Sequence, residues 1–375
     1  MFKIFRYYFE NLTDSRRSGS IRHEFFDILF IAVITILCSG EGFEEMHRFA
    51  KYQRKWFEKY IKLSGGIPSA DTFSRVLNLI DPSEFSKSFT GLFKSIAKYS
   101  GIKIEESHVA IDGKNLRGSR HLDEDGNKEV THIVNALNVN LGISIGQVKV
   151  DKEQYVNEIS AILDILDIID LKGTMITIDG ISNKKITKKI REKGGNYTVV
   201  LKENNKNLYK AVRERMLNEI SSLSPFEEED KYRNILRKVY VMDVKGIDDS
   251  LLFQDAKTII YYQHLEKKNK EYLSDKLFLS SKKLDTEEAY KYVRGHWNIE
   301  NNLHWVLDVN FNEDKSKIRK GNAPAVLSAI RKLTYNILKM NKDKISLKGK
   351  VRRAVYDIEF REKLISDHIT NWAVK

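Results

Sequence analysis

Two aspartates in the sequence follow short apolar segments, and each precedes a glycine. Asp112 ends the segment 108–112, and Asp179 ends the segment 174–179. Such segments are typical of buried strands, and ligands of open α/β sheets collect beyond the carboxyl ends of the strands. If the two strands are parallel neighbours, both carboxylates face one pocket and repel each other unless a cation lies between them. The alternative is that an Asp-Gly pair after a strand is only a turn.

The segment 292–305 contains the best candidate for a third carboxylate. His296, Glu300 and His304 are spaced four residues apart, which places them on one face of a helix. Three carboxylates suit Mg²⁺ or Mn²⁺, and two such ions would activate a nucleophile and stabilise the leaving oxygen of a phosphodiester. A zinc site of the two histidines and Glu300 is an alternative, although this spacing is long for tetrahedral coordination. In a second alternative, Glu300 is solvated or pairs with Arg294.

Lysines and arginines close to these carboxylates in the sequence are candidate contacts to DNA phosphates. Any one of them could instead be an ordinary solvated charge. The candidates are Lys114, Arg117, Lys202, Arg294, Lys315, Lys317, Arg319 and Lys320.

The chain is basic, and the excess charge is concentrated in two zones. Its 375 residues include 64 Lys and Arg against 52 Asp and Glu, a net charge of +12. Residues 182–215 hold eleven basic against three acidic residues, and residues 315–375 hold sixteen against five. This distribution favours a polyanion as partner, most simply nucleic acid, although a Lys-rich face can also be merely solvated.

The composition argues against a membrane or secreted protein. The longest apolar run, 28–38, is shorter than the roughly 18 residues that a membrane helix needs. The N-terminal residues do not resemble a secretory signal. The single cysteine, Cys38, excludes a disulfide scaffold and a cysteine-rich zinc module. We expect a cytoplasmic bacterial protein that is associated with the nucleoid when it binds DNA.

The order of expected elements divides the chain into three zones. Residues 1–103 are predicted to be helical, and this region either binds DNA ends or only packs. Residues 104–342 have the order β-β-β-α-β-α-β, which predicts an α/β fold with a mixed sheet and flanking helices. A β-rich insertion is expected at about 203–281, and residues 343–375 are expected to form a basic C-terminal tail.

Several of these segments resemble the H-repeat-associated transposases of bacterial insertion sequences. The resemblance lies in Ile-Asp112-Gly-Lys-Asn-Leu-Arg-Gly-Ser119, in Thr-Ile-Asp179, and in the segments 296–308 and 318–323, with 27–32 and 67–75 nearer the N-terminus. It covers about residues 20–342, in the family's order. It implies a ribonuclease-H-like core and a DDE active site. In that site Asp112, Asp179 and Glu300 would bind two Mg²⁺ or Mn²⁺ ions, with Asp112 bridging both.

The sequence departs from the family pattern beside the triad. Gly180-Ile-Ser-Asn183 stands where the family usually has Ala-Met-Gly-Cys, and Leu201-Lys-Glu-Asn204 where it has Leu-Lys-Gly-Asn. The Tyr, Arg and Lys that the wider superfamily sets around its catalytic glutamate would fall on Val293, His296 and Leu307. All three carboxylates of the triad are kept.

Together these features predict a DNA transposase that cuts at the ends of its element and joins the freed 3′-hydroxyl to target DNA. The resemblance implies a homodimer in the DNA complex. Two other classes stay open. One is a nuclease of the same fold that cuts but does not join, and the other is a DNA-binding protein without catalysis, such as a decayed copy.

Overall fold

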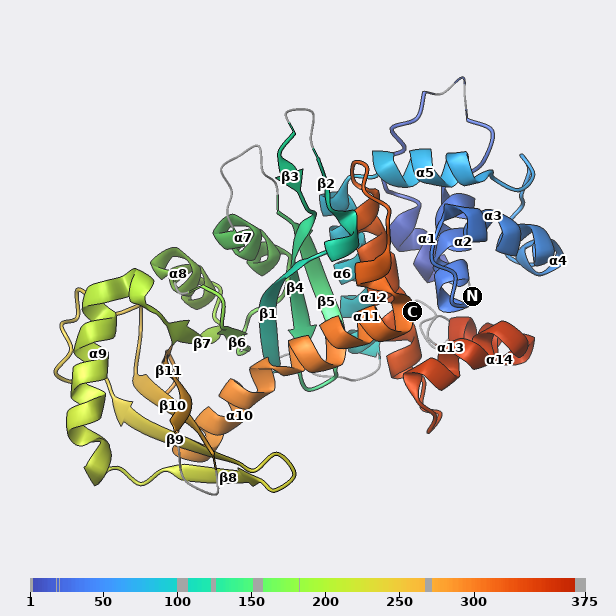
Figure 1. Cartoon of the computed structure of the whole chain (residues 1–375). Helices are drawn as coiled ribbons and strands as arrows, with labels where there is room; N and C mark the ends of the chain where they lie inside the picture. The colour runs from blue at the N-terminus through green and yellow to red at the C-terminus, as the bar shows by residue number, and fades with distance from the viewer. Residues whose placement is uncertain are drawn as a thin grey trace.

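One nine-stranded sheet runs through the molecule in the order β5-β4-β1-β6-β7-β11-β10-β9-β8 (Figure 1). This computed structural model describes residues 3–17, 19, 21–99, 107–122, 126–150, 158–181, 183–266 and 272–367. The core strands are β1 (His108–Asn115), β4 (His132–Asn138), β5 (Ile143–Lys149), β6 (Met175–Ile178) and β7 (Asn196–Leu201). A separate ribbon pairs β2 (His121–Leu122) with β3 (Lys128–Glu129).

The core strands have the connectivity that the sequence predicted. β1 pairs with β4 antiparallel on one side and with β6 parallel on the other. β5 is antiparallel to β4, and β7 is parallel to β6. The crossovers are α7 (Glu158–Ile168) and α8 (Lys184–Glu192), since parallel neighbours need a helical connection. This mixed sheet with flanking helices confirms the predicted ribonuclease-H-like fold class.

The β-rich insertion extends this sheet instead of forming a separate one. It begins with α9 (Lys206–Glu219) and continues with β8 (Phe226–Asp230), β9 (Ile235–Asp243), β10 (Thr258–Glu266) and β11 (Tyr272–Ser280). β11 pairs antiparallel with β7. The acidic patch at 227–230 belongs to the edge strand β8, where Glu228 and Glu227 pair with Arg237 and Lys238 on β9. Pairing across the two strands allows a charged sequence to form a strand.

Helices from both ends of the chain form one body beside the sheet (Figure 1). The N-terminal helices are α1 (Lys3–Phe9), α2 (Phe25–Leu37), α3 (Phe43–Tyr52), α4 (Arg54–Phe57), α5 (Ala70–Leu79) and α6 (Pro82–Tyr99). α2 carries the longest apolar run, and Phe26 through Leu37 are all buried. No helix in the described ranges combines the length and apolar character needed to cross a membrane. The domain boundary expected at 103–104 lies outside the described residues.

The C-terminal residues differ from the expected basic tail. α12 (Ala323–Met340), α13 (Leu347–Tyr356) and α14 (Ile358–Asp367) pack on the N-terminal helices and share their core. Val351, Ala354 and Leu364 are buried there. Arg361 is fully buried, with its guanidinium carbon 4.5 Å from the centre of the Trp56 ring. The many basic residues of this region made its apolar helical face hard to recognise in the sequence. Residues 368–375 lie outside the described part of the chain.

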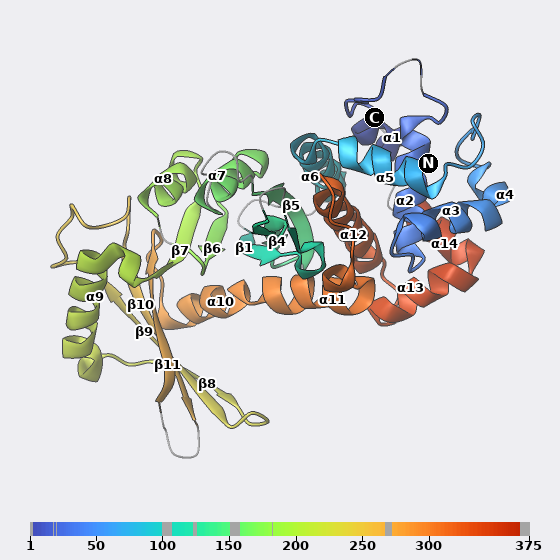
Figure 2. The ribbon, with the colours of Figure 1, turned by 45° about the horizontal axis from the view of Figure 1, so that its top comes forward.

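A continuous helical run links the insertion to the helical body. It consists of α10 (Thr286–His296), a π-helix over Ile299–His304 and α11 (Trp305–Phe311). Figure 2 shows this run along one side of the core strands, with α7 and α8 on the opposite side. Ile299, Leu303 and Leu307 anchor it in the same core as the N-terminal helices. The run therefore holds residue 300 against the core strands.

Candidate active site

Asp112 and Asp179 stand side by side on neighbouring strands. The parallel register pairs Ile111 with Ile178, and the residue that follows each of them in the chain is an aspartate. Asp179 directly follows β6, as expected. Asp112 lies inside β1, which continues to Asn115 along β4, so the first Asp-Gly pair is not a turn.

Glu300 reaches the same place from the π-helix. The wider turns of a π-helix change which side chains share a face. His296 and His304 are buried, whereas Glu300 is exposed, so the three residues do not share the single face predicted from their spacing. Nevertheless, the carboxylate of Glu300 is close enough to Asp112 for its charge to raise the pKa of that aspartate.

The two buried histidines of this segment have different neighbours. His304 Nε2 accepts a hydrogen bond from Asn135 at 3.1 Å, which leaves Nδ1–H facing Asp112 Oδ2 at 3.7 Å. His296 Nδ1 lies 3.1 Å from the hydroxyl of Thr177 on β6. Burial lowers the pKa of His304 to about 3 and that of His296 to about 4, so both are neutral at pH 7. The histidines point to different partners, and the geometry does not assemble the zinc alternative.

Asp112 lies in a strongly perturbing electrostatic environment. Burial raises its pKa, and the charges of Glu300, Glu158 and Asp179 raise it further, to about 7. The backbone N–H of Gly113 opposes this shift. A buried carboxylate among other carboxylates is a strained arrangement that a cation relieves.

Lys276 is a site residue that the sequence analysis missed. It lies on β11, and its Nζ donates to Asp179 Oδ2 at 2.5 Å. The ammonium thus places a positive charge beside this carboxylate. The other oxygen, Asp179 Oδ1, is buried without a hydrogen-bond partner among the described residues. No local pattern marks Lys276, because its contact depends on the pairing of β11 with β7.

The donor set fits divalent metal ions. Carboxylate oxygens are the ligands that Mg²⁺ and Mn²⁺ prefer. The orphaned Asp179 oxygen and the raised pKa of Asp112 both indicate that positive charge is needed here. Over the described ranges, no three His, Cys, Asp or Glu side chains are already drawn together as a ligand set.

The candidate DNA contacts fall into two groups. Lys114 corrects our expectation, because it is buried between Asp308 at 2.6 Å and Glu313 at 3.1 Å and does not face solvent. Lys202 is exposed and donates to the carbonyl of Gly180 beside Asp179. The remaining candidates outside α10 are exposed at the surface. They are Arg117, which pairs with Asp314, and Lys315, Lys317, Arg319 and Lys320.

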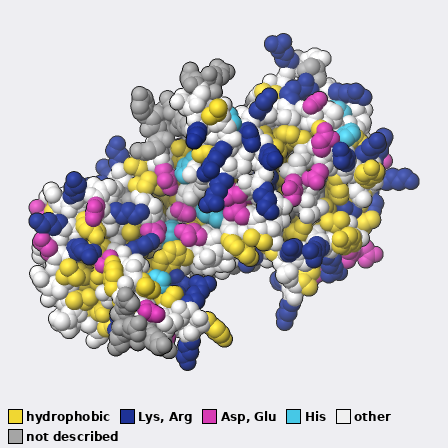
Figure 3. All heavy atoms as spheres, in the orientation of Figure 1, with side chains coloured by type: hydrophobic (Ala, Val, Ile, Leu, Met, Phe, Trp, Pro, Cys, Tyr) yellow, Lys and Arg dark blue, Asp and Glu magenta, His cyan; other side chains and the backbone are white. Residues whose placement is uncertain are grey.

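Figure 3 shows that acidic side chains gather near the middle of one face and that Lys and Arg border them. DNA approaching the acidic side chains on this face would therefore meet basic side chains around them. Such an arrangement attracts the phosphate backbone while leaving the centre available to cations.

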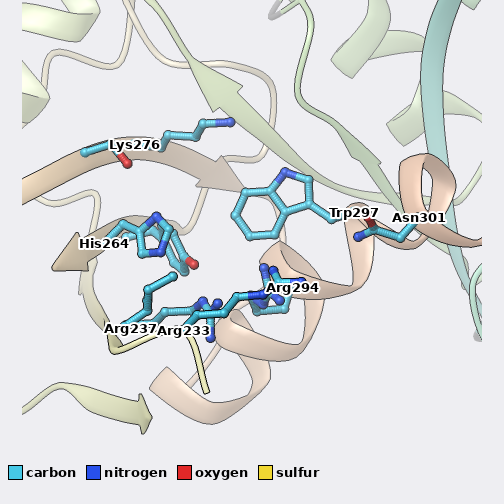
Figure 4. Close-up of a pocket in the computed structure, with 10 residues that line it drawn as sticks. Arg233, Arg237, His264, Lys276, Arg294, Trp297 and Asn301 are labelled. Atoms are coloured by element: carbon cyan, nitrogen blue, oxygen red, sulfur yellow. The ribbon is translucent and has the colours of Figure 1, made fainter. Parts of the chain in front are cut away.

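A basic pocket adjoins the site on the side of the insertion (Figure 4). It encloses about 210 Å³ and is lined by Arg233, Ile235, Arg237, Tyr262, His264, Ser274, Lys276, Arg294, Trp297 and Asn301. The Arg294 guanidinium stacks on Trp297, with its carbon 4.7 Å from the ring centre. Lys276 belongs to this pocket and also contacts Asp179, so the pocket opens beside the candidate catalytic carboxylates.

Replacement of Asp112 by asparagine is expected to stabilise the metal-free protein above pH 7. The folded-state pKa of about 7 exceeds the ordinary 3.8, so wild-type stability falls as pH rises from 3.8 to 7 and then stays low. Asp112→Asn removes this penalty, with a gain of about 2–3 kcal/mol at alkaline pH and none near pH 4. This gain in the free energy of unfolding is measured by unfolding in urea, with a chelator present to remove divalent cations. The control Asp164→Asn, exposed on α7, should change little; equal stabilities of Asp112→Asn and wild type at about pH 8 would contradict the prediction.

Comparisons with known proteins agree with this geometry. Residues 103–337 match the family model described as "Transposase DDE domain", and residues 6–92 match its associated domain, "DDE_Tnp_1-associated". The chain is 34% identical over 358 residues to "Putative transposase YncI" of Escherichia coli O157:H7, covering 92% of this chain and 89% of that protein.

Another relative is "H repeat-associated putative transposase YhhI" of Escherichia coli K12, at 30% identity, with 95% of this chain and 96% of that protein covered. Among solved structures, a piggyBac transposase synaptic complex with hairpin DNA aligns over 96% of this chain and 80% of that chain. Its TM-score of 0.43 and 13% identity make it a distant likeness. The matches to the family models and to these relatives show that the chain belongs to the DDE transposases, in the H-repeat-associated group.

Proposed function

We propose that this protein catalyses transposition of an insertion sequence, with Asp112, Asp179 and Glu300 as its catalytic, metal-binding carboxylates. The observation that carries the proposal is the parallel register of β1 and β6, which sets Asp112 beside Asp179. The π-helix then brings Glu300 to Asp112. Mg²⁺ or Mn²⁺, two ions when fully loaded, would supply activation of the attacking water or 3′-hydroxyl and stabilisation of the leaving oxygen.

The surrounding residues support this role through fixed contacts. Neutral His304 holds Asp112 from Nδ1 and is itself oriented by Asn135. This is the pattern by which outer residues orient a metal-binding side chain. Lys276 donates to Asp179, so its ammonium stands where it would also meet a DNA phosphate bound at the site.

DNA is the proposed substrate, and the exposed cations are its proposed contacts. Lys202 donates to the carbonyl of Gly180 beside Asp179, Arg117 and the lysines and arginine of the segment 315–320 are exposed, and Arg294 lines the adjoining pocket. We assign Lys114 to folding because its ammonium is already paired twice. Cutting two ends in one complex requires two active sites, so the proposed DNA-bound state is a homodimer.

Replacement of Arg319 by alanine is expected to weaken DNA binding in a salt-dependent way. Each lost phosphate contact lowers the slope of log affinity against log salt by about 0.9. Arg319 is exposed and is one of the proposed DNA contacts, whereas the control Lys245 is exposed on the insertion and pairs with Asp243. DNA-binding titrations at several salt concentrations compare the two alanine variants. An unchanged slope for Arg319→Ala would remove that residue from the interface.

The function is tested with DNA that carries the ends of the element encoding this chain. Wild-type protein with Mg²⁺ should nick at the element ends and join a pre-cut end to target DNA. Nicking without joining would favour the nuclease alternative. Tight binding without cleavage, in Mg²⁺ and in Mn²⁺, would favour a non-catalytic DNA-binding protein and contradict the proposal.

A further inference from the structure

A fourth carboxylate, that of Glu158, lies between the two strands that carry the aspartates. Glu158 is the first residue of α7. A Cβ atom added at Gly113 would stand 2.4 Å from Glu158 Oε1, and one added at Gly180 would stand 3.6 Å from the same oxygen. The carboxylate therefore projects toward the residues that follow Asp112 and Asp179. Its charge also reaches Asp112.

This position explains the glycine after Asp112. Gly113 lies inside β1 and pairs with Val134, and its φ is not among the positive values that would demand glycine. A turn therefore does not account for it. Any side chain at this position would collide with Glu158 Oε1 and with the His132 ring, whose Nε2 would stand 2.9 Å from the added Cβ. The glycine makes room for the carboxylate.

Among the described residues, Glu158 has no Lys or Arg partner that could make it a simple structural ion pair. His132 lies beside it, with Nε2 3.9 Å from Glu158 Oε2. Burial lowers the pKa of His132, so the imidazole is neutral at pH 7. Across the described residues, Glu158 forms no ion pair with Lys or Arg. Its side chain is about three-quarters buried, with 27% exposed.

Two further oxygens at this place lack partners. Asn135 pairs with Asp112 across β1 and β4, so the two side chains share one face of the sheet. Asn135 is fully buried, and its Oδ1 has no hydrogen-bond partner within the described structure. Asp179 Oδ1 is likewise buried and has no hydrogen-bond partner among the described residues. Buried oxygens without donors, next to several carboxylates, are the environment that a hydrated divalent cation satisfies.

We propose that Glu158 is a fourth metal-binding carboxylate, which holds a divalent cation together with Asp112 and Asp179. This inference rests on the proposed function and adds a ligand from α7 to the triad. Carboxylates from β1, β6 and α7 then surround one ion. The exposed Glu300 approaches Asp112 from the π-helix that lies between α10 and α11.

Binding of Mn²⁺ to the full-length protein, measured by the electron paramagnetic resonance signal of the free ion, tests the inference without catalysis. Glu158→Gln should weaken Mn²⁺ binding by about tenfold or more, by analogy with the losses that follow removal of groups around metal sites. The matched control is Asp164→Asn, which removes the same charge from an exposed position of the same helix and should bind as wild type does. Wild-type affinity in Glu158→Gln would overturn the proposal.

A second pair of variants keeps the carboxylate and moves it. Gly113→Ala places a Cβ against Glu158 Oε1, so the side chain must shift and Mn²⁺ binding should weaken severalfold. Gly180→Ala makes only an ordinary contact at 3.6 Å and should bind as wild type does. Equal effects of the two alanines would contradict a role for the exact placement of Glu158. Thermal unfolding of each variant checks that it is folded.

Failure of this inference is distinguishable from failure of the proposed function. If Asp112→Asn and Asp179→Asn lose Mn²⁺ binding while Glu158→Gln keeps it, the triad stands and the fourth ligand is wrong. If all three variants keep wild-type affinity, the metal site itself is wrong and both proposals fall.

Discussion

Replacement of Asp112 or Asp179 by asparagine, or of Glu300 by glutamine, is expected to lower Mg²⁺-dependent nicking at the element ends by on the order of 10³-fold. Each amide keeps the size of the side chain and removes the negative charge that holds a cation. The three carboxylates come from β1, the residue after β6, and the π-helix, so each loss removes a different support of the same centre. Quantitative gel assays of nicked product against time measure the effect.

DNA binding should survive in these variants, because the basic residues around the site are untouched. The matched control is Glu287→Gln, an exposed glutamate of α10 that pairs with Lys291 on its own helix. It should cleave within about twofold of wild type, because an exposed pair of this kind contributes little. Cleavage at near wild-type rates in any one triad variant would remove that residue from the catalytic set.

Replacement of Glu313 by glutamine is expected to destabilise the protein by about 3–5 kcal/mol, since removal of one partner leaves buried charges uncompensated. Glu313 is completely buried, between Lys114 at 3.1 Å and the hydroxyl of Ser328 at 2.7 Å. Lys332 donates to the same serine and to Gln147, and burial lowers its pKa to about 8. The variant would leave the positive charges of this cluster without their central anion.

The pH dependence of this effect has a definite sign. Burial alone would raise the pKa of Glu313, but the charges of Lys332, Lys114 and Arg331 outweigh it and lower the pKa from 4.5 to about 2. The stabilisation is therefore fully present above pH 4.5 and is lost as pH falls toward 2. The stability difference between wild type and Glu313→Gln should shrink over that range, as measured by urea unfolding.

The neighbouring residue Asp314 provides the control for this experiment. It pairs with Arg117 near the surface, and the side chain of Arg117 is 73% exposed. Asp314→Asn should therefore cost no more than about 1 kcal/mol. An equal loss of free energy of unfolding in both variants would mean that the buried cluster contributes no more to stability than the surface pair does. A stable Glu313→Gln protein would show that the lysines lose their charge at little cost.

The local sequence was sufficient for the core strands and for the two aspartates. The segments 108–112 and 174–179 are short and apolar, and they form β1 and β6 in the expected parallel pair. The apolar run at 28–38 likewise forms the buried helix α2. These features follow from the side chains of consecutive residues, because burial and backbone preference act within a few positions. The motif around Glu300 likewise predicted the third carboxylate that we propose for the site.

Contacts between distant segments were beyond local inference. The charge of Lys114 suggested phosphate binding, but Asp308 and Glu313 fold back over it. Lys276 reaches Asp179 only because β11 joins the sheet beside β7. Because residues 299–304 form a π-helix, Glu300 does not share a helix face with the two histidines. The helices α13 and α14 were hidden by their basic composition, since their apolar face has meaning only against the N-terminal helices.

The sequence by itself determined the order of the elements, the carboxylates and the basic character of this chain. The tertiary structure decided which charges face solvent and which are paired inside the protein. It also decided that Glu158 stands beside Gly113 and Gly180, the residues that follow the two aspartates, although nothing around residue 158 in the sequence marks it. The physical reason is that electrostatic interactions and burial depend on distance in space. The pairing of the strands and the packing of the helical run set those distances, and neither is encoded in neighbouring residues.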